Sequence, residues 1–201
     1  MHIRQPASSR DRILDAAKQL FASRGYDNTS TAVIARAANT SESQLMKHFG
    51  SKEGLLEAIF DQGWEKMKFF FRAIHELQSG AEKLSTLLDL MVATLDRDPE
   101  LKGLMLLEGR RVRKEGHMVM MTSGYREFIR VVDAILAEMR ATRELREDFD
   151  LQAVRSALVG MFEAMLRDQL LAQRMGYPAN YSSAEIRKIF PSILAALAPP
   201  P

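Results

Sequence analysis

The sequence predicts an all-α protein with an N-terminal three-helix helix-turn-helix domain followed by a larger helical body. Apolar residues recur at helical spacing along the chain, and from residue 52 onward no segment has the pattern of a strand. Ser and Asp precede these apolar runs, whereas Gly, Asn and Pro follow them, as expected at helix starts and stops. We expect residues 1–52 to form the first domain and residues 53–201 the second.

Composition excludes several classes of protein. Apolar residues make up 46% of the 201 residues and charged residues 27%, which is typical of a globular chain rather than a disordered one. The chain has no cysteine and only four scattered histidines, so we expect no disulfide, no metal site and no cofactor. No signal-type segment and no run of about 18 apolar residues occurs, which predicts a cytoplasmic protein without a membrane partner. No phosphate loop, HExxH or GxSxG sequence occurs, so we expect no enzyme.

Positive charge is concentrated near the N-terminus. Residues 1–52 hold eight Lys and Arg against four Asp and Glu, whereas the remainder holds 20 against 22. A basic end on a near-neutral body is typical of a protein that contacts phosphate there. Unrelated domains share this balance, so it has weight only beside a binding motif.

The first two helices are expected from local signals. Ser8 or Ser9 can cap a helix that Gly25 ends. A second, short helix ends at Asn39, a residue that tolerates the left-handed conformation. The apolar positions of these two helices are Ile13, Leu14, Ala17, Leu20, Phe21, Val33, Ile34, Ala37 and Ala38.

The next helix has the features of a DNA-reading helix. Ser41 and Gln44 form a capping box at its start, and Leu45 and Phe49 give it an apolar stripe. Because the first turn of such a helix reaches base edges, the candidate base readers are Ser41, Glu42, Ser43, Gln44 and Lys47. The simpler alternatives remain open: a capping role for Gln44, a helix-dipole role for Glu42, and a solvated surface position for Lys47.

This segment resembles the DNA-binding domain of the TetR family of bacterial transcriptional regulators. The residues that match, in the family's order, are Gly25-Tyr26, Thr29-Ser30-Thr31, Ile34-Ala35, Ala38-Asn39-Thr40-Ser41, Leu45-Met46-Lys47-His48-Phe49 and Lys52-Glu53-Gly54-Leu55. The resemblance covers about residues 9 to 56. It departs from the family at Asn39-Thr40, at Ser43 and at Met46, where the family usually has a tyrosine that contacts phosphate.

The resemblance implies DNA-backbone contacts at Thr29, Ser30, Thr31, His48 and Lys52. Free N–H groups at helix N-termini also favour phosphate. His48 is alternatively a structural histidine. Arg4, Arg10 and Arg12 can form a basic arm, although a disordered, solvated tail is the preferred interpretation.

The body is expected to contain further helices. They are a long helix from about 52 to Ser79-Gly80, a helix around 84–97 that Asp98-Pro99 ends, and helices over about 100–115, 119–141 and 151–174. Ser182 and Glu185 form a capping box for a last helix that Pro191 should kink or end. A cationic cluster at 110–114 is expected to form local ion pairs or to bind an anion.

Two features of the body suggest function. Its methionines suit a pocket that adapts to apolar ligands, with expected lining residues Trp64, Met67, Met105, Met121, Tyr125, Phe128 and Met161. Methionine that fills an irregular core is the alternative.

Small residues at spacing 4, 3 and 4 allow close helix approach, and in the family the last two long helices form a dimer; the expected interface residues are Ala153, Ala157, Gly160, Met161 and Ala164. The same row can instead pack within its own chain.

The resemblance implies a homodimeric regulator, usually a repressor, that binds a pseudo-palindromic double-stranded DNA operator and is released by a largely apolar small molecule. One alternative is a helical small-molecule-binding dimer whose DNA reader is weak or non-functional, as Met46 and the Asn39-Thr40 turn suggest. Another is a helical enzyme whose site has no sequence signature.

Overall fold

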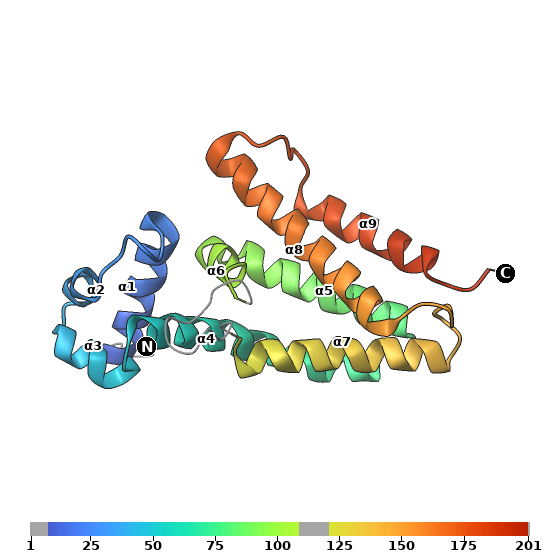
Figure 1. Ribbon diagram of the computed structural model, residues 1–201, viewed down its shortest axis with the longest axis horizontal. Coiled ribbons are helices and arrows are strands. Elements are labelled where there is room, and N and C mark those ends of the chain that lie inside the picture. The colour runs from blue at the N-terminus through green and yellow to red at the C-terminus, as the bar shows by residue number, and fades with distance from the viewer. Residues whose placement is uncertain (1–7, 109–120, 201) are drawn as a thin grey trace, which may run out of the picture.

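The computed structural model describes residues 8–108 and 121–200. These residues form nine α-helices and one short 3-10 helix, with no strand among them, which confirms the all-α class. The three N-terminal helices gather at one end of the molecule and the later helices form the body (Figure 1). Arg4 and the cationic cluster at 110–114 lie outside the described residues.

The N-terminal helices begin and end where local chemistry predicts. They are α1 (Ser9–Arg24), α2 (Thr31–Ala37) and α3 (Glu42–Phe49). Ser8, Ser30 and Ser41 cap them, each hydroxyl accepting a hydrogen bond from the backbone N–H three residues on. Asn39 has φ of 50°, which confirms the left-handed turn between α2 and α3.

Helix α4 (Lys52–Ala73) connects this end to the body. Ser51 caps it, and the helix packs first against α1 and α3 and then against the body helices. It ends six residues before the expected Ser79, in a 3-10 turn at Ile74–Glu76. Ser79 instead caps α5 (Gly80–Asp96), whose first N–H groups, those of Gly80 and Ala81, donate to the carboxylate of Glu144.

Helix α6 (Pro99–Met105) is shorter than expected. Asp98 caps it and accepts a hydrogen bond from the Leu101 N–H. The expected helix over 100–115 is therefore wrong between residues 106 and 108, which form a turn. The rest of that segment, and the expected start near 119, lie outside the described residues.

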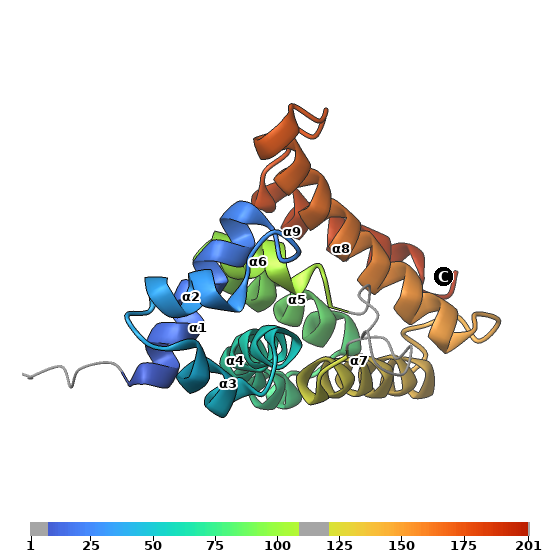
Figure 2. The ribbon, with the colours of Figure 1, turned by 60° about the vertical axis from the view of Figure 1, so that its left-hand side comes forward.

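Three helices complete the body: α7 (Ser123–Ala141), α8 (Leu151–Met175) and α9 (Ser183–Ala196). Helix α8 meets α7 near the loop that joins them, and the two helices diverge from there (Figures 1 and 2). Helix α9 packs against α5. Pro191 does not end α9, and Ser182 makes no side-chain cap, so the expected capping box is wrong. No helix among the described residues is long and apolar enough to span a membrane.

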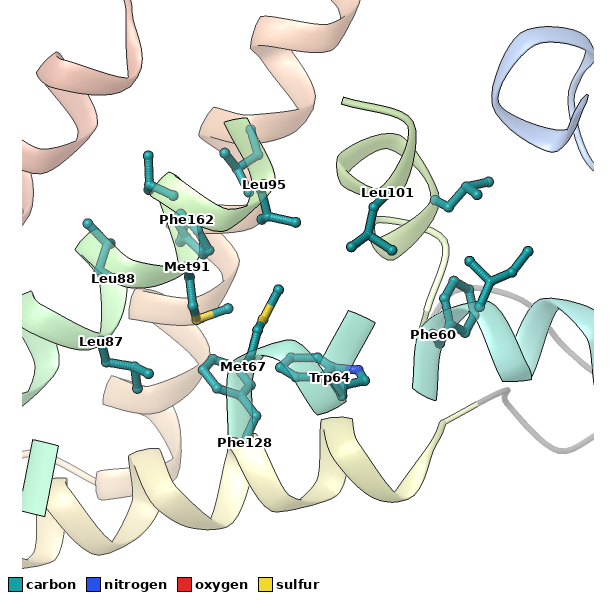
Figure 3. Packing of buried hydrophobic residues seen from close by; sticks show 14 of the residues in the cluster. Phe60, Trp64, Met67, Leu87, Leu88, Met91, Leu95, Leu101, Phe128 and Phe162 are labelled. Atoms are coloured by element: carbon teal, nitrogen blue, oxygen red, sulfur yellow. The ribbon is translucent and has the colours of Figure 1, made fainter. Parts of the chain in front are cut away.

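A single apolar core runs from the N-terminal helices into the body. Its centre lies where Met67 of α4 and Met91 of α5 point toward one another between Trp64, Phe128 and Phe162 (Figure 3). Trp64 and Phe128 stack with ring centroids 5.4 Å apart. This aromatic cluster fixes α4 against α7.

Candidate nucleic-acid interface and ligand cavity

Three side chains form the outer face of α3. Ser43, Gln44 and Lys47 are exposed and have no hydrogen-bond or ion-pair partner among the described residues, whereas Leu45 on the opposite face is fully buried. The face is thus polar and available to base edges. An N–H and O–H donor set with an amide acceptor can read the major groove.

The first turn of α3 has a different role. The Ser41 hydroxyl accepts a hydrogen bond of 3.1 Å from the Gln44 N–H, so it is engaged as a cap. The Glu42 carboxylate accepts a hydrogen bond from the Thr31 hydroxyl, which joins the first turns of α2 and α3. Ser41 therefore caps α3, whereas Glu42 connects α3 to α2, and the capping bond uses the backbone N–H of Gln44 rather than its side chain.

Thr29 lies in the interior, and the phosphate contact expected for it is corrected. Its side chain is 1% exposed, and its hydroxyl donates 2.8 Å to the carbonyl of Gly25. Its N–H donates to the Tyr26 carbonyl. No donor of Thr29 is left to meet DNA in this conformation, so we remove it from the phosphate-binding set.

His48 and Lys52 lie near the edges of the exposed face and have partners within the domain. His48 Nε2 and Ser9 Oγ are joined by a hydrogen bond of 3.0 Å, which fixes the imidazole beside α1. The Lys52 ammonium lies 4.3 Å from the centroid of the Tyr26 ring and 3.5 Å from the Asp27 carbonyl oxygen. Lys52 is half-buried, so any DNA contact competes with this packing.

Two further residues of this domain have contacts or positions that the sequence did not predict. Arg12 Nε donates 3.2 Å to the Ala38 carbonyl, which ties α1 to the turn between α2 and α3. Met46, 43% exposed, occupies the flank of α3 opposite His48. Its thioether has no strong donor for phosphate, but an exposed apolar group can contact a thymine methyl.

Five of the seven expected pocket residues line one small cavity in the body. These are Trp64, Met67, Met105, Tyr125 and Phe128. The cavity is about 40 Å³, and a second void of about 30 Å³ adjoins it, sharing Met91, Phe128, Val159 and Phe162. Small-molecule sites generally need 300–1,000 Å³. A ligand therefore enters only if the lining side chains move apart, which flexible methionines allow.

The other two expected pocket residues lie elsewhere. Met121 is exposed and lines a groove between α7 and α8. Met161 lies on another face of α8, in a groove with Ala157 and Ile193. Met161 follows the helix one residue before Phe162, which lines the inner cavity. With 3.6 residues in a turn, neighbouring side chains point in different directions, so Met161 faces away from that cavity.

Two charged groups at the cavity are buried and hydrogen-bonded: Lys102 lines the cavity, and Glu108 lies behind its wall, bonded to the Trp64 indole. Lys102, 6% exposed, donates to Gln169 Oε1 at 2.8 Å and to Asp96 at 3.2 Å. Glu108, 4% exposed, accepts hydrogen bonds from the Trp64 indole and from the Thr122 N–H and hydroxyl. Burial raises the pKa of Glu108 above its ordinary value, although these hydrogen bonds oppose the rise.

Small residues on α8 face outward. Ala153, Ala157 and Gly160 are exposed, and a Cβ built on Gly160 meets no atom within 4 Å. They lie opposite Val154, Leu158 and the other buried positions of the helix, and Ala164 beside them is half-buried. Within the described part of the chain, Ala153, Ala157 and Gly160 therefore do not pack against another helix, which was the alternative interpretation.

Helix α6 joins the cavity to the N-terminal domain. Asp98 at its start accepts from Lys18 of α1 at 2.9 Å and from Lys66 of α4 at 3.5 Å. One and two turns later, Lys102 and Met105 line the cavity. Burial alone would raise the pKa of Asp98, but hydrogen bonds from Lys18 and the Leu101 N–H outweigh it and the pKa is lowered. If the cavity walls move, α6 can therefore transmit the displacement to α1 through Asp98 and Lys18.

The N-terminal helices match a known family of proteins. Residues 13–59 match the family model of bacterial regulatory proteins, tetR family. The HTH-type transcriptional regulator YvkB of Bacillus subtilis is 49% identical over 51 residues, which are 25% of this chain and only 27% of that protein. The fatty acid metabolism regulator protein of Bacillus subtilis is 27% identical over 158 residues, or 76% of this chain and 78% of that one.

Solved structures share the whole fold. The regulator FadR from Bacillus subtilis, in complex with stearoyl-CoA, has a TM-score of 0.76 at 20% identity, over 92% of this chain and 97% of its own. The fatty acid degradation regulator FadR from Bacillus halodurans has a TM-score of 0.74 at 22% identity, over 96% and 97%. At these identities the likeness establishes the arrangement of helices.

Proposed function

Because the chain belongs to the TetR family of bacterial transcriptional regulators, we propose that it is a dimeric repressor released from a pseudo-palindromic operator by a small apolar molecule. The observation that supports this best is the exposed polar face of α3, whose readers have no competing partner among the described residues. Residues 1–52 would act as the DNA-binding domain and residues 53–201 as the effector and dimerisation domain.

In the proposed complex, α3 enters the major groove of each half-site. Gln44 would pair with adenine through its N6 and N7 groups, and Lys47 would contact guanine or phosphate. Ser30, Thr31, His48 and Lys52 would flank the groove and meet the backbone. Since a two-fold dimer presents two equal readers, the operator would be an inverted repeat.

The outward row of small residues on α8 supports dimerisation. Ala153, Ala157 and Gly160 leave the helix surface open to close approach by a second helix. The adjoining groove of about 450 Å³ is lined by apolar side chains of α8 and α9, Met161 and Ile193 among them. Buried apolar area of this kind favours association.

The inner cavity supports an effector with an apolar chain. Its lining is almost wholly apolar, and the relatives named above include a regulator of fatty acid metabolism and a structure that holds stearoyl-CoA. A chain that forces the lining apart would move α6 and, through Asp98, α1 and α4. A coupling free energy of about 1–3 kcal/mol would weaken DNA binding roughly 5- to 150-fold.

The proposal is tested by selecting DNA with the purified protein. Fragmented DNA from the source genome is incubated with the protein at moderate salt, and the retained fragments are sequenced. Enrichment of a short inverted repeat, lost when Gln44 and Lys47 are both replaced by alanine, supports the proposal. Retention without any shared sequence, unchanged by those substitutions, would favour a protein that binds small molecules but does not read DNA.

A further inference from the structure

The end of the long helix α8 contacts the first helix of the DNA-binding domain. Arg174, in the last turn of α8, donates a hydrogen bond of 3.1 Å from Nη2 to the carbonyl of Ala22, in the last turn of α1. The two residues are 152 positions apart in the chain. Figure 2 shows the last turn of α1 just below the last turns of α8. The contact therefore joins the DNA-binding domain directly to α8, in addition to α4 and α6.

The Ala22 carbonyl is one of the acceptors that a helix leaves unpaired at its C-terminus. The last four carbonyls of a helix have no N–H partner within the helix itself. In α1 the Gly25 N–H donates to the Phe21 carbonyl, and Arg174 donates to the next carbonyl along the chain. A guanidinium also complements the negative end of the helix dipole. Arg174 thus acts as a C-terminal cap of α1 that comes from another helix.

Two residues one turn apart on α1 attach it to two different body helices. Lys18 pairs with Asp98 at the start of α6, and Ala22, four residues later on the same face, accepts from Arg174. Gly103 of α6 lies beside the same guanidinium, since a Cβ built on it comes within 3.7 Å of Nη2. Helix α1 is therefore held at one point by the helix that lines the cavity and at a second point by α8.

Helix α8 also carries the small residues of the proposed dimer face. It runs without a break from Leu151 to Met175. At 1.5 Å per residue, the helix places Arg174 about 20–30 Å from the exposed Ala153, Ala157 and Gly160. Because a continuous helix of this length transmits position along its axis, the contact at Arg174 relates the place of α1 to the face that meets the second protomer.

We propose that Arg174 is a positioning residue that fixes the separation of the two reader helices in the dimer, by holding the end of α1 against α8. The inference rests on the proposed function, because the separation matters only in a dimer that reads two half-sites. Arg174 then determines the spacer length of the operator, whereas Gln44 and Lys47 determine its bases. One base pair more or less moves a half-site by about 3.4 Å and turns it by about 35° around the duplex. A fixed separation should reject such a site.

The test uses the inverted repeat that the wild-type protein selects, with its spacer unchanged, shortened or lengthened by one base pair. Binding of the intact protein to each labelled duplex is measured by fluorescence anisotropy. We expect the wild type to bind the two altered spacers at least about tenfold more weakly than the selected one. Arg174→Met cannot donate to Ala22, so this penalty should fall about threefold or more. Arg174→Lys can donate to the same carbonyl and should keep most of the penalty.

A duplex with a single half-site controls for damage to the reader, and affinity for it should stay within about twofold of the wild type in every variant. Arg167→Met is the matched control on the same helix. Arg167 is also exposed, and it faces Asp168 of its own helix at 3.5 Å, so its loss should leave the spacer penalty unchanged.

Two results would overturn the inference and leave the proposed function intact. One is a wild-type spacer penalty in Arg174→Met, and the other is an equal loss of its affinity on all three spacers. In both cases the wild type still selects an inverted repeat. If the wild type selects no inverted repeat, the proposed function and the inference both fail.

Discussion

The carboxylate of Asp98 lies 2.9 Å from the ammonium of Lys18, and this pair connects the start of α6 to α1 of the DNA-binding domain. Lys66 of α4 approaches the same carboxylate at 3.5 Å. Since Lys102 and Met105 of α6 line the cavity, one short helix contacts the effector site and both helices that support the reader. Asp98 therefore connects the proposed effector site to the proposed DNA-reading domain.

Replacing Lys18 by methionine should weaken the link without unfolding the protein. The pair is partly exposed, so its loss should cost less than about 1 kcal/mol of folding free energy. DNA affinity without effector should stay nearly unchanged, whereas the reduction of DNA affinity by dodecanoyl-CoA should become smaller. DNA titrations with and without the thioester measure both quantities. If Lys18→Met responds to the thioester as fully as the wild type, this ion pair does not transmit the signal.

Replacing Gln44 by alanine should change sequence preference as well as affinity. Loss of a bidentate contact should cost about 1–3 kcal/mol at one base position of each half-site and relax the preference there. Binding to a panel of operators with single-base changes measures the effect. Lys47→Ala on the same face is the matched comparison. An equal loss on every operator would mean that Gln44 reads no base.

Replacing Thr29 by valine should affect folding rather than DNA binding. The carbonyl of Gly25 would lose its hydroxyl donor, at a cost of about 0.5–1.5 kcal/mol in unfolding free energy. Chemical denaturation measures this cost, and operator affinity is measured well below the melting temperature. We expect affinity equal to that of the wild type. A stable Thr29→Val protein with uniformly weaker DNA binding would restore Thr29 to the phosphate contacts.

Replacing Glu108 by glutamine should alter how stability depends on pH. Burial raises the folded-state pKa of Glu108 above its unfolded value of about 4.3. Stability from this group is then full below about pH 4.3 and is lost as pH rises through the folded pKa. The difference in unfolding free energy between wild type and Glu108→Gln should therefore shift against the wild type as pH rises. Denaturation followed by circular dichroism measures it, and parallel pH curves would contradict the assignment.

Local signals were sufficient for much of the fold. Ser8 and Ser41 cap helices as expected because a cap depends only on residues within one turn. Asn39 adopts the left-handed turn for the same local reason. The exposed face of α3 also follows from helical spacing around Leu45.

Contacts between distant residues determined what the sequence did not predict. The chain leaves α6 early where Glu108 accepts hydrogen bonds from Trp64, 44 residues away, and from Thr122. Similarly, α5 starts at Gly80 where Glu144 accepts its first N–H groups. The burial of Thr29 and its bond to Gly25 depend on how α1 packs, so apolar periodicity could not reveal them.

The most direct test of the account is operator affinity as a function of cavity occupancy. Binding of the wild-type dimer to its selected inverted repeat is measured by fluorescence anisotropy of labelled DNA while dodecanoyl-CoA is added, and Trp64 emission reports occupancy in the same sample. The account predicts that the apparent Kd for the operator rises about 5- to 150-fold as the cavity fills. Full occupancy with an unchanged operator Kd would contradict it.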